Sequence, residues 1–254
     1  MNHTKTYYPS YPLNQFVSLI WVSESTNYKI QAEHYAPLFT ELIFNFGDSF
    51  IVTGQNIDVF NLENCNHIIS GLKTEPFNTM ISGKNMNIGL ILKPFCYGMI
   101  SKRDSKKNIQ KLSDVLFEQF FMLKNTNLDI VNKELSRLFN DFKLDHDLLN
   151  FEKYLNNSLS ESKTIKDFNS TISISQKSFI QKFKKHFLIT PSEYLKLKQV
   201  NRAIWRLENE NVNNLTNLGL DCGFYDQSHF IRIFKRYCGQ TPTQFSKKVN
   251  SVQF

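Results

Sequence analysis

In this 254-residue sequence, the residues best suited to specific binding are cations and amides that recur at helical spacing near the C-terminus. The segment Gly223–Pro242 (GFYDQSHFIRIFKRYCGQTP) sorts apolar side chains to one side of a helix and polar or basic ones to the other. Arginine, glutamine and serine can form hydrogen bonds with the edges of nucleic-acid bases, and lysine can neutralise phosphates. A solvated charged face is the alternative interpretation of such a pattern.

The pattern occurs twice, which favours a function over simple solvation. Residues 175–196 align without gaps on residues 226–247, at an offset of 51. Each copy opens with a good helix N-cap, Ser175 or Asp226, and each closes with a Thr-Pro pair that begins a further capping box. The basic half is therefore predicted to be a duplicated helical unit. Matching pairs include Gln176 and Gln227, Phe179 and Phe230, Ile180 and Ile231, Phe183 and Phe234, Lys184 and Lys235, and Thr190 and Thr241.

A short helix is expected before each capped helix, beginning near Ile165 in the first copy and near Leu215 in the second. Gly223 should end the second short helix, and a long helix over about Pro191–Leu207 should bridge the copies. A short helix, a tight turn and a capped helix with basic exposure make a helix-turn-helix unit. The second helix of such a unit enters the major groove of DNA, with its N-terminal residues leading.

The distribution of charge supports a separate basic domain. Residues 1–150 carry 14 Lys and Arg against 15 Asp and Glu, whereas residues 151–254 carry 16 against 8. Basic domains bind polyanions, which can be nucleic acid, an acidic membrane surface or an acidic protein. No apolar run approaches the roughly 20 residues of a membrane span, and the N-terminus has no apolar signal core, so we expect a cytoplasmic protein. The four cysteines, expected to be free buried thiols, are Cys65, Cys96, Cys222 and Cys238.

The front half has the pattern of a β-rich domain. Strands are expected within 16–22, 41–54 and 87–95, with a turn at Gly47-Asp48 and a hairpin loop at 83–85. These elements favour a sandwich or barrel. A helical period runs over Ile109–Phe142. The fold class is therefore α+β with two domains, an all-α one following a β-rich one, and the predicted boundaries are 1–108, 109–146 as a helical connector, and 147–254.

Residues for enzyme chemistry do not group in the front half. His34 and His67 stand alone, and no GxSxG, P-loop or GxGxxG motif occurs, so no catalytic residue, metal or cofactor is predicted. Glu41 and Asp48 are expected in a solvated strand and turn. Candidates to line an apolar ligand pocket, with core packing as the alternative for each, are Trp21, Phe44 and Phe46.

The basic half resembles the AraC-type family of bacterial transcription regulators over about residues 150–250. The motif is Leu215-x-x-Leu218-Gly219, then Gly223-Phe224-x-Asp226-x-Ser228-x-Phe230-x-Arg232-x-Phe234-Lys235, then Gly239-x-Thr241-Pro242. The resemblance implies two helix-turn-helix units in successive major grooves of double-stranded DNA, about 34 Å apart on an asymmetric site. The front half resembles, more weakly, sensor-like domains of such regulators, which implies a β-barrel or double-sheet sensor, with a cupin-like barrel as one form, and a small-molecule effector. The motifs are Pro12-Leu13-x-x-Phe16-Val17 with Trp21 soon after, Leu42-Ile43-Phe44-Asn45-Phe46-Gly47-Asp48, and Ile88-Gly89-x-x-Leu92-Lys93-Pro94. Resemblance to family members that dimerise before the DNA-binding part implies a homodimer through the helical stretch 109–142, and RNA polymerase is a further candidate partner.

The same resemblance implies roles for individual side chains. Arg232 is left open, because a phosphate contact or a structural role fits it as well as a base contact. The positions implied to contact bases are Lys177, Ile180 and Gln181 in the first unit and Gln227, Ser228, Ile231 and Arg232 in the second. The positions implied to contact phosphates are Lys184, Lys185, Lys235 and Arg236.

The first unit departs from the family pattern at three positions. Asn169 stands where a small residue packs the two helices together, Ser173 stands where the turn has glycine, and Gln181 replaces arginine. A serine forced to positive φ at position 173 costs about 1 kcal/mol. Two alternatives therefore stay open. One is a degenerate family member that acts through protein contacts, and the other is a small-molecule-binding or enzymatic barrel that the basic half localises.

Overall fold

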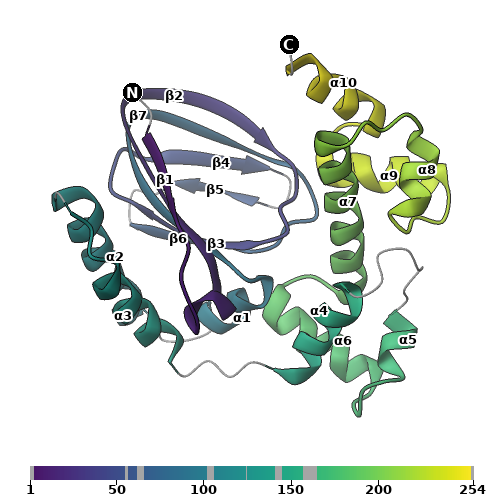
Figure 1. Ribbon diagram of the computed structural model, residues 1–254, viewed down its shortest axis with the longest axis horizontal. Helices are drawn as coiled ribbons and strands as arrows, with labels where there is room; N and C mark the ends of the chain where they lie inside the picture. The colour runs from purple at the N-terminus through teal and green to yellow at the C-terminus, as the bar shows by residue number, and fades with distance from the viewer. Residues whose placement is uncertain are drawn as a thin grey trace. The chain divides into compact units, whose positions relative to one another are not determined.

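The computed structural model describes residues 3–54, 57–61, 66–101, 106–123, 125–140, 145–156 and 165–252 (Figure 1). The chain forms two compact units. The first comprises Met1–Glu33, Phe39–Gly71 and Asn78–Lys143, and the second comprises His34–Leu38, Leu72–Phe77 and Leu144–Phe254. Two short segments of the front half thus belong to the C-terminal unit. None of the helices in the described ranges is long and apolar enough to cross a membrane.

The first unit is built on a seven-stranded sheet. Its strand order is β1-β2-β7-β3-β6, with β4 paired to β5 and β7. The printed registers of β1 with β2, β3 with β6 and β7, and β4 with β5 are antiparallel. Figure 1 shows β2 and β7 as long, curved strands. The strands are β1 His3–Tyr7, β2 Val17–His34, β3 Thr40–Asn45, β4 Phe50–Gly54, β5 Ile57–Asn61, β6 His67–Ser70 and β7 Phe77–Leu92.

Alternation along β3 divides this sheet into two faces. Leu42 and Phe44 are fully buried, and their cross-strand partners on β7 are Leu90 and Ile88. The ring of Phe46, on the same face, packs against Phe117 and Phe121 of the helical segment. That segment confirms the expected helical period. It consists of α1 Tyr97–Ile100, α2 Lys106–Phe117, a π-helical turn Glu118–Met122 and α3 Leu128–Phe139.

One expected hairpin is wrong. The sequence predicted a loop at 83–85, but β7 runs through these residues without a break. Gly83 adopts φ +103 within the strand, and a Cβ there would lie 2.1 Å from Asp48 Oδ2. That carboxylate accepts the Lys84 N–H at 2.7 Å, and the Asp48 N–H donates to the Lys84 carbonyl at 2.7 Å. Asp48, in the expected turn at Gly47-Asp48, is exposed as expected and also forms hydrogen bonds with the backbone of β7.

The second unit is helical. Its helices are α4 His146–Asn156, α5 Ile165–Asn169, α6 Gln176–Phe187, α7 Pro191–Asn209, α8 Leu215–Asp221, α9 Gln227–Cys238 and α10 Pro242–Val252.

The segment His34–Leu38 is part of this helical unit through backbone hydrogen bonds. The Ala36 N–H donates to the Tyr237 carbonyl at 2.9 Å, and Asn201 Nδ2 donates to the Ala36 carbonyl at 3.2 Å. The ring of Tyr35 packs edge-on against Phe245. Residues from the front half therefore contribute to the packing of α7, α9 and α10.

The titratable groups considered from the sequence are buried or partly buried. Cys96, Cys222 and Cys238 are free thiols, and burial raises the pKa of each, while Cys65 lies outside the described residues. Burial lowers the pKa of both His34 and His67. Within the described ranges, no three His, Cys, Asp or Glu side chains gather as metal ligands.

Candidate nucleic-acid interface

The first helix-turn-helix unit is α5 and α6, held on α4 by an aromatic cluster. Phe151 of α4 contacts Phe168 of α5 and both Phe179 and Phe183 of α6, with ring centroids 4.9–5.3 Å apart. The N-cap predicted at Ser175 is confirmed, because its Oγ accepts the Ser178 N–H at 3.2 Å. Phenylalanines at every fourth position thus fix which side of α6 faces inward and leave the other side to solvent.

The second unit, α8 and α9, repeats this design. Phe230 and Phe234 are fully buried, and Phe224 packs on Phe230 with centroids 4.9 Å apart. Asp226 is confirmed as the N-cap of α9, since its Oδ1 accepts the His229 N–H at 2.7 Å. At the start of each helix the cap accepts one of the N–H groups that lack a partner within the helix.

The long helix α7 joins the units and confirms the predicted bridge. It opens with the expected capping box, in which Thr190 Oγ1 accepts the Glu193 N–H and Glu193 Oε2 accepts the Thr190 N–H. The Tyr237 hydroxyl of α9 donates to the Glu193 carbonyl at 3.2 Å. Farther along, Gln199 Nε2 donates to the Gly223 carbonyl at 2.8 Å. The first turn of α7 therefore contacts the last turn of the second recognition helix.

Helices α6 and α9 present matching stripes, each made of three polar residues and one isoleucine. On α6, positions 177, 180, 181 and 184 follow the spacing i, i+3, i+4 and i+7, which places them on one face. Positions 228, 231, 232 and 235 on α9 are their equivalents at the offset of 51. Ile180 is half-buried, whereas the other candidates for base and phosphate contacts are exposed. These exposed residues are Lys177, Gln181, Lys184, Lys185, Gln227, Ser228, Ile231, Arg232, Lys235 and Arg236.

Arg236, which was implied to contact phosphate, lies near the Glu193 carboxylate of the protein itself. Burial would raise the pKa of Glu193, but hydrogen bonds from Thr190 and the charges of Arg236 and Lys184 hold that pKa below its usual value. Two of the cations implied to bind phosphate thus stabilise a carboxylate at the start of α7. Arg206 makes a further link between helices, with Nε 2.7 Å from Glu210 and a terminal nitrogen 3.0 Å from Asp221 of α8.

The turn of the first unit does not carry the strain that its sequence suggested. Among the described non-glycine residues, only Leu188 has a positive φ, so Ser173 does not, whereas Gly223 in the second turn has φ +87. Six residues separate α5 from α6, and five separate α8 from α9, so the longer first turn closes without a left-handed residue. The expected cost at Ser173 is therefore wrong.

Asn169, at the position where α5 packs on α6, destabilises the first unit. Neither amide atom of Asn169 has a hydrogen-bond partner, although both are buried. Gly219 serves this position in the second unit, where an added Cβ would lie 2.9 Å from the Phe230 ring. Unpaired buried polar atoms are destabilising. Asn169 is thus a real departure, in the packing of the first unit and not in its exposed stripe.

The three pocket candidates of the front half are not brought together. Phe44 and Phe46 lie on the face of the sheet that packs against helices. Trp21 lies on the other face, because a Cβ at Gly89 would meet its indole at 2.1 Å and Gly89 pairs with Ile43. The Trp21 Nε1 donates to Glu41 Oε1 at 2.6 Å. The Trp21 face also carries the polar side chains of Ser23, Ser25, Asn85 and Asn87, which were not among the candidates predicted from the sequence.

Comparisons with known proteins agree with this geometry. Residues 170–248 match a family described as a helix-turn-helix domain, and residues 5–109 match a domain of unknown function, DUF6597. The probable transcriptional regulator LumQ of Photobacterium leiognathi is 27% identical over 124 residues, which are 48% of this chain and 49% of that protein. The Msm operon regulatory protein of Streptococcus mutans is 24% identical over 161 residues, 55% of this chain and 58% of the relative.

The chain thus spans about half the length of these curated relatives. The structure of ToxT from Vibrio cholerae superposes on 97% of this chain and 98% of its own, with a TM-score of 0.51 and 11% sequence identity. This likeness is one of fold.

Proposed function

We propose that this protein is an AraC-type transcription regulator that binds double-stranded DNA in a sequence-specific way, because residues 170–248 match a helix-turn-helix domain family. Each of its two units places its second helix, α6 or α9, in a major groove, and the two grooves are successive. The observation that carries the proposal is the polar stripe that recurs at equivalent positions of both helices. Because the stripes differ in sequence, the DNA site is asymmetric.

The proposed contacts divide by chemistry. Gln227 is the first residue of α9 and Gln181 lies near the middle of α6, and the amide of each can read base edges. Lys184 and Lys235 lie farther along each helix, where an ammonium group binds a phosphate. Binding therefore weakens as salt rises, because each neutralised phosphate releases counterions.

Four single substitutions test this division. Lys184→Gln and Lys235→Gln weaken binding to specific and random DNA alike and reduce the slope of log K against log salt by about 0.9 each. Gln181→Ala and Gln227→Ala change which sequences are preferred, by about 1–3 kcal/mol per lost base contact. Fluorescence anisotropy on specific and random duplexes at several salt concentrations separates the two effects. If all four substitutions act identically on both duplexes, the assignment of roles is wrong.

The front half is proposed to bind a small-molecule effector on the Trp21 face of its sheet. Ser25 Oγ and Asn87 Oδ1 are buried without a hydrogen-bond partner, and Asn85 Nδ2 donates to Ser23 Oγ at 2.8 Å. These donors and acceptors suit a polar ligand. A thermal-shift screen of polar metabolites on the folded protein tests this. A ligand that stabilises Asn87→Leu as strongly as the wild type would place the site elsewhere.

The remaining partners follow from the proposed role. We propose a cytoplasmic regulator without catalytic activity that contacts RNA polymerase and forms a homodimer. The apolar stripes of α2 and α3 are buried within the first unit, so among the described residues the exposed Met122, Leu123, Leu128 and Ile130 are what the helical segment offers a second chain. Light scattering at micromolar concentration without DNA tests the dimer, and a monomer mass contradicts it.

Asn169 favours a second candidate function. Its unpaired buried amide weakens the first unit, which suits a family member that has lost DNA binding and acts through protein contacts. The anisotropy experiment also decides this point, because such a protein would bind neither duplex.

A further inference from the structure

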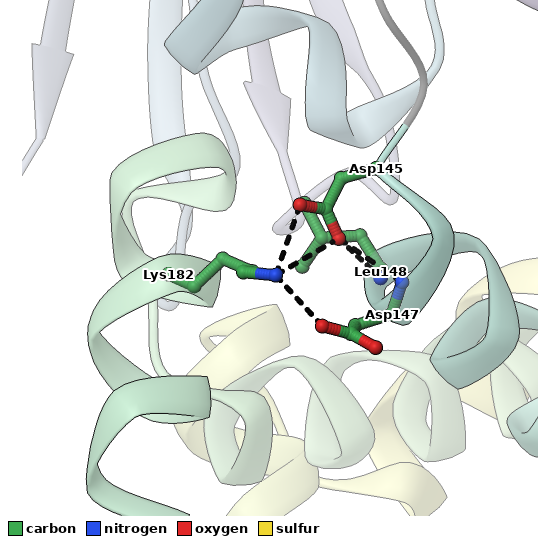
Figure 2. Close-up of polar contacts among 4 residues, drawn as sticks. All are labelled: Asp145, Asp147, Leu148 and Lys182. Atoms are coloured by element: carbon green, nitrogen blue, oxygen red, sulfur yellow. Dashed lines mark hydrogen bonds and ion pairs between the residues drawn. The ribbon is translucent and has the colours of Figure 1, made fainter. Parts of the chain in front are cut away.

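The first recognition helix has an ionic attachment at a position where the second has an apolar one. Lys182 lies in the middle of α6, and its Nζ is 3.0 Å from Asp145 Oδ2 and 2.7 Å from Asp147 Oδ2. Figure 2 shows the lysine extending across to both carboxylates at the start of α4. The charge of this lysine is therefore already compensated within the protein.

The carboxylates are themselves held in place by the backbone of α4. Asp145 Oδ1 accepts the N–H groups of Asp147 at 3.0 Å and Leu148 at 3.2 Å, as an N-cap does. The Asp145 carbonyl accepts the Leu149 N–H at 3.0 Å. Lys182 thus bonds to a fixed helix end and not to a mobile surface side chain.

The internal repeat shows on which side of the helix Lys182 lies. At the offset of 51 its equivalent on α9 is Ile233, which is 6% exposed and belongs to the packed core of the second unit. Lys182 is itself 31% exposed. The same helix position therefore serves packing in both units, and it lies apart from the stripe formed by positions 177, 180, 181 and 184.

The ion pair of Lys182 with Asp145 and Asp147 is directional, whereas the packing of the aromatic cluster is not. Apolar contacts such as those of Phe151 with Phe179 and Phe183 are strong but weakly directional. Charge-assisted hydrogen bonds fix a direction. Side chains that read bases must be held in one geometry, since a small displacement of the helix moves every one of them.

We propose that Lys182 is a positioning residue for the first recognition helix, fixing α6 on α4 through Asp145 and Asp147, and that it does not contact DNA phosphate. The proposal rests on the proposed function, because it concerns how the first unit reads its half of the DNA site.

Full-length variants test it. Lys182→Met removes one positive charge and Asp147→Asn removes one negative charge, so a purely electrostatic effect on DNA would have opposite signs in the two variants. The double variant completes the cycle. Lys184→Met is the comparator for a phosphate contact, and Arg137→Met, which removes an ion pair with Glu134 on α3, is the matched control. For each protein, binding is measured to the selected site, to that site with either half scrambled, and over a range of salt.

Under the proposal, Lys182→Met and Asp147→Asn each reduce discrimination in the half read by α6 by about fivefold, and the double variant loses no more than either. Discrimination in the other half and the salt slope stay as in the wild type. Lys184→Met instead lowers the slope by about 0.9. Lys182→Arg retains the discrimination, and thermal unfolding shows that each variant is folded. Should Lys182→Met fail to fold, Asp147→Asn alone decides, because it preserves size and hydrogen-bonding shape.

Two results would overturn the inference while leaving the proposed function intact. A salt slope that falls in Lys182→Met as it does in Lys184→Met would make Lys182 a phosphate contact. Unchanged discrimination in folded Lys182→Met and Asp147→Asn would make the ion pair a structural feature only. If the wild-type protein discriminates neither half, the proposed function fails, and the inference fails with it.

Discussion

Leu188 adopts a left-handed backbone conformation that is strained for leucine, while its equivalent in the second unit is a glycine. It is the C-cap of α6 with φ 67, and its counterpart at the C-cap of α9 is Gly239 with φ 77. Both N–H groups bond back into the helix, to the carbonyls of Lys184 at 3.0 Å and Lys235 at 2.8 Å. The backbone requires a left-handed residue at both sites, and glycine meets that requirement without steric cost, whereas leucine does not.

Exchanging the residue type at these two caps should change stability in opposite directions. Leu188→Gly relieves the left-handed strain and raises the free energy of unfolding by about 1 kcal/mol, because the Leu188 side chain is 43% exposed and contributes little packing. Gly239→Ala lowers it by about 1 kcal/mol. Urea denaturation of the two variants measures both changes. A Leu188→Gly variant less stable than wild type would show that packing of the leucine outweighs the strain.

At the scale of elements, the two units differ in how closely their helices approach. Gly219 lets α8 lie against Phe230 of α9, while Asn169 stands at the same position between α5 and α6. The close approach in the second unit has no room for a side chain. The first unit accommodates a larger side chain but leaves its amide unpaired.

Alanine at these two sites should therefore have opposite effects. Gly219→Ala inserts a methyl group against a fully buried ring and destabilises the protein by about 1–3 kcal/mol. Asn169→Ala removes two unpaired polar atoms and stabilises it by about 1 kcal/mol. Thermal unfolding of both variants is the measurement. Equal destabilisation by the two changes would contradict this view of the packing.

The attachment of α4 to α6 should depend on pH in the acid range. Partial burial would raise the pKa of Asp145, but hydrogen bonds from Lys182 and from the Leu148 and Asp147 N–H groups hold it below its usual value. A carboxyl whose folded pKa lies below the unfolded value of about 3.9 stabilises the fold above that pH. The stabilisation is lost as the pH falls through the folded pKa.

Asp145→Asn isolates this contribution, because asparagine still caps the helix but carries no charge. Wild type should be the more stable protein at pH 7, and the difference should shrink as the pH falls below about 4. Urea denaturation of both proteins between neutral and acid pH measures the difference. A difference that stays constant over this range would mean that the Asp145 charge contributes nothing.

At the scale of the whole molecule, what could be predicted from sequence follows from the range of the interactions. The helix caps depend on local sequence, and the repeat shows each kind of cap twice. Ser175 matches Asp226, and Thr190 matches Thr241. Contacts between distant residues left no local pattern. Asp48 bonds to Lys84, which is 36 positions away in a segment that the sequence predicted as a hairpin loop. Lys182 bonds to Asp145, which is 37 positions away. The repeat does indicate that Lys182 is unusual, because its equivalent Ile233 is an apolar residue of the core.

Selection of DNA from a pool of randomised duplexes by the full-length protein, at two salt concentrations, tests whether both helix-turn-helix units read bases. We expect an asymmetric motif that spans two successive major grooves and is bound more weakly at the higher salt. A motif confined to one groove would mean that only one unit reads bases. Failure to bind any duplex, by a folded protein, would contradict the account and favour a regulator that works through protein contacts.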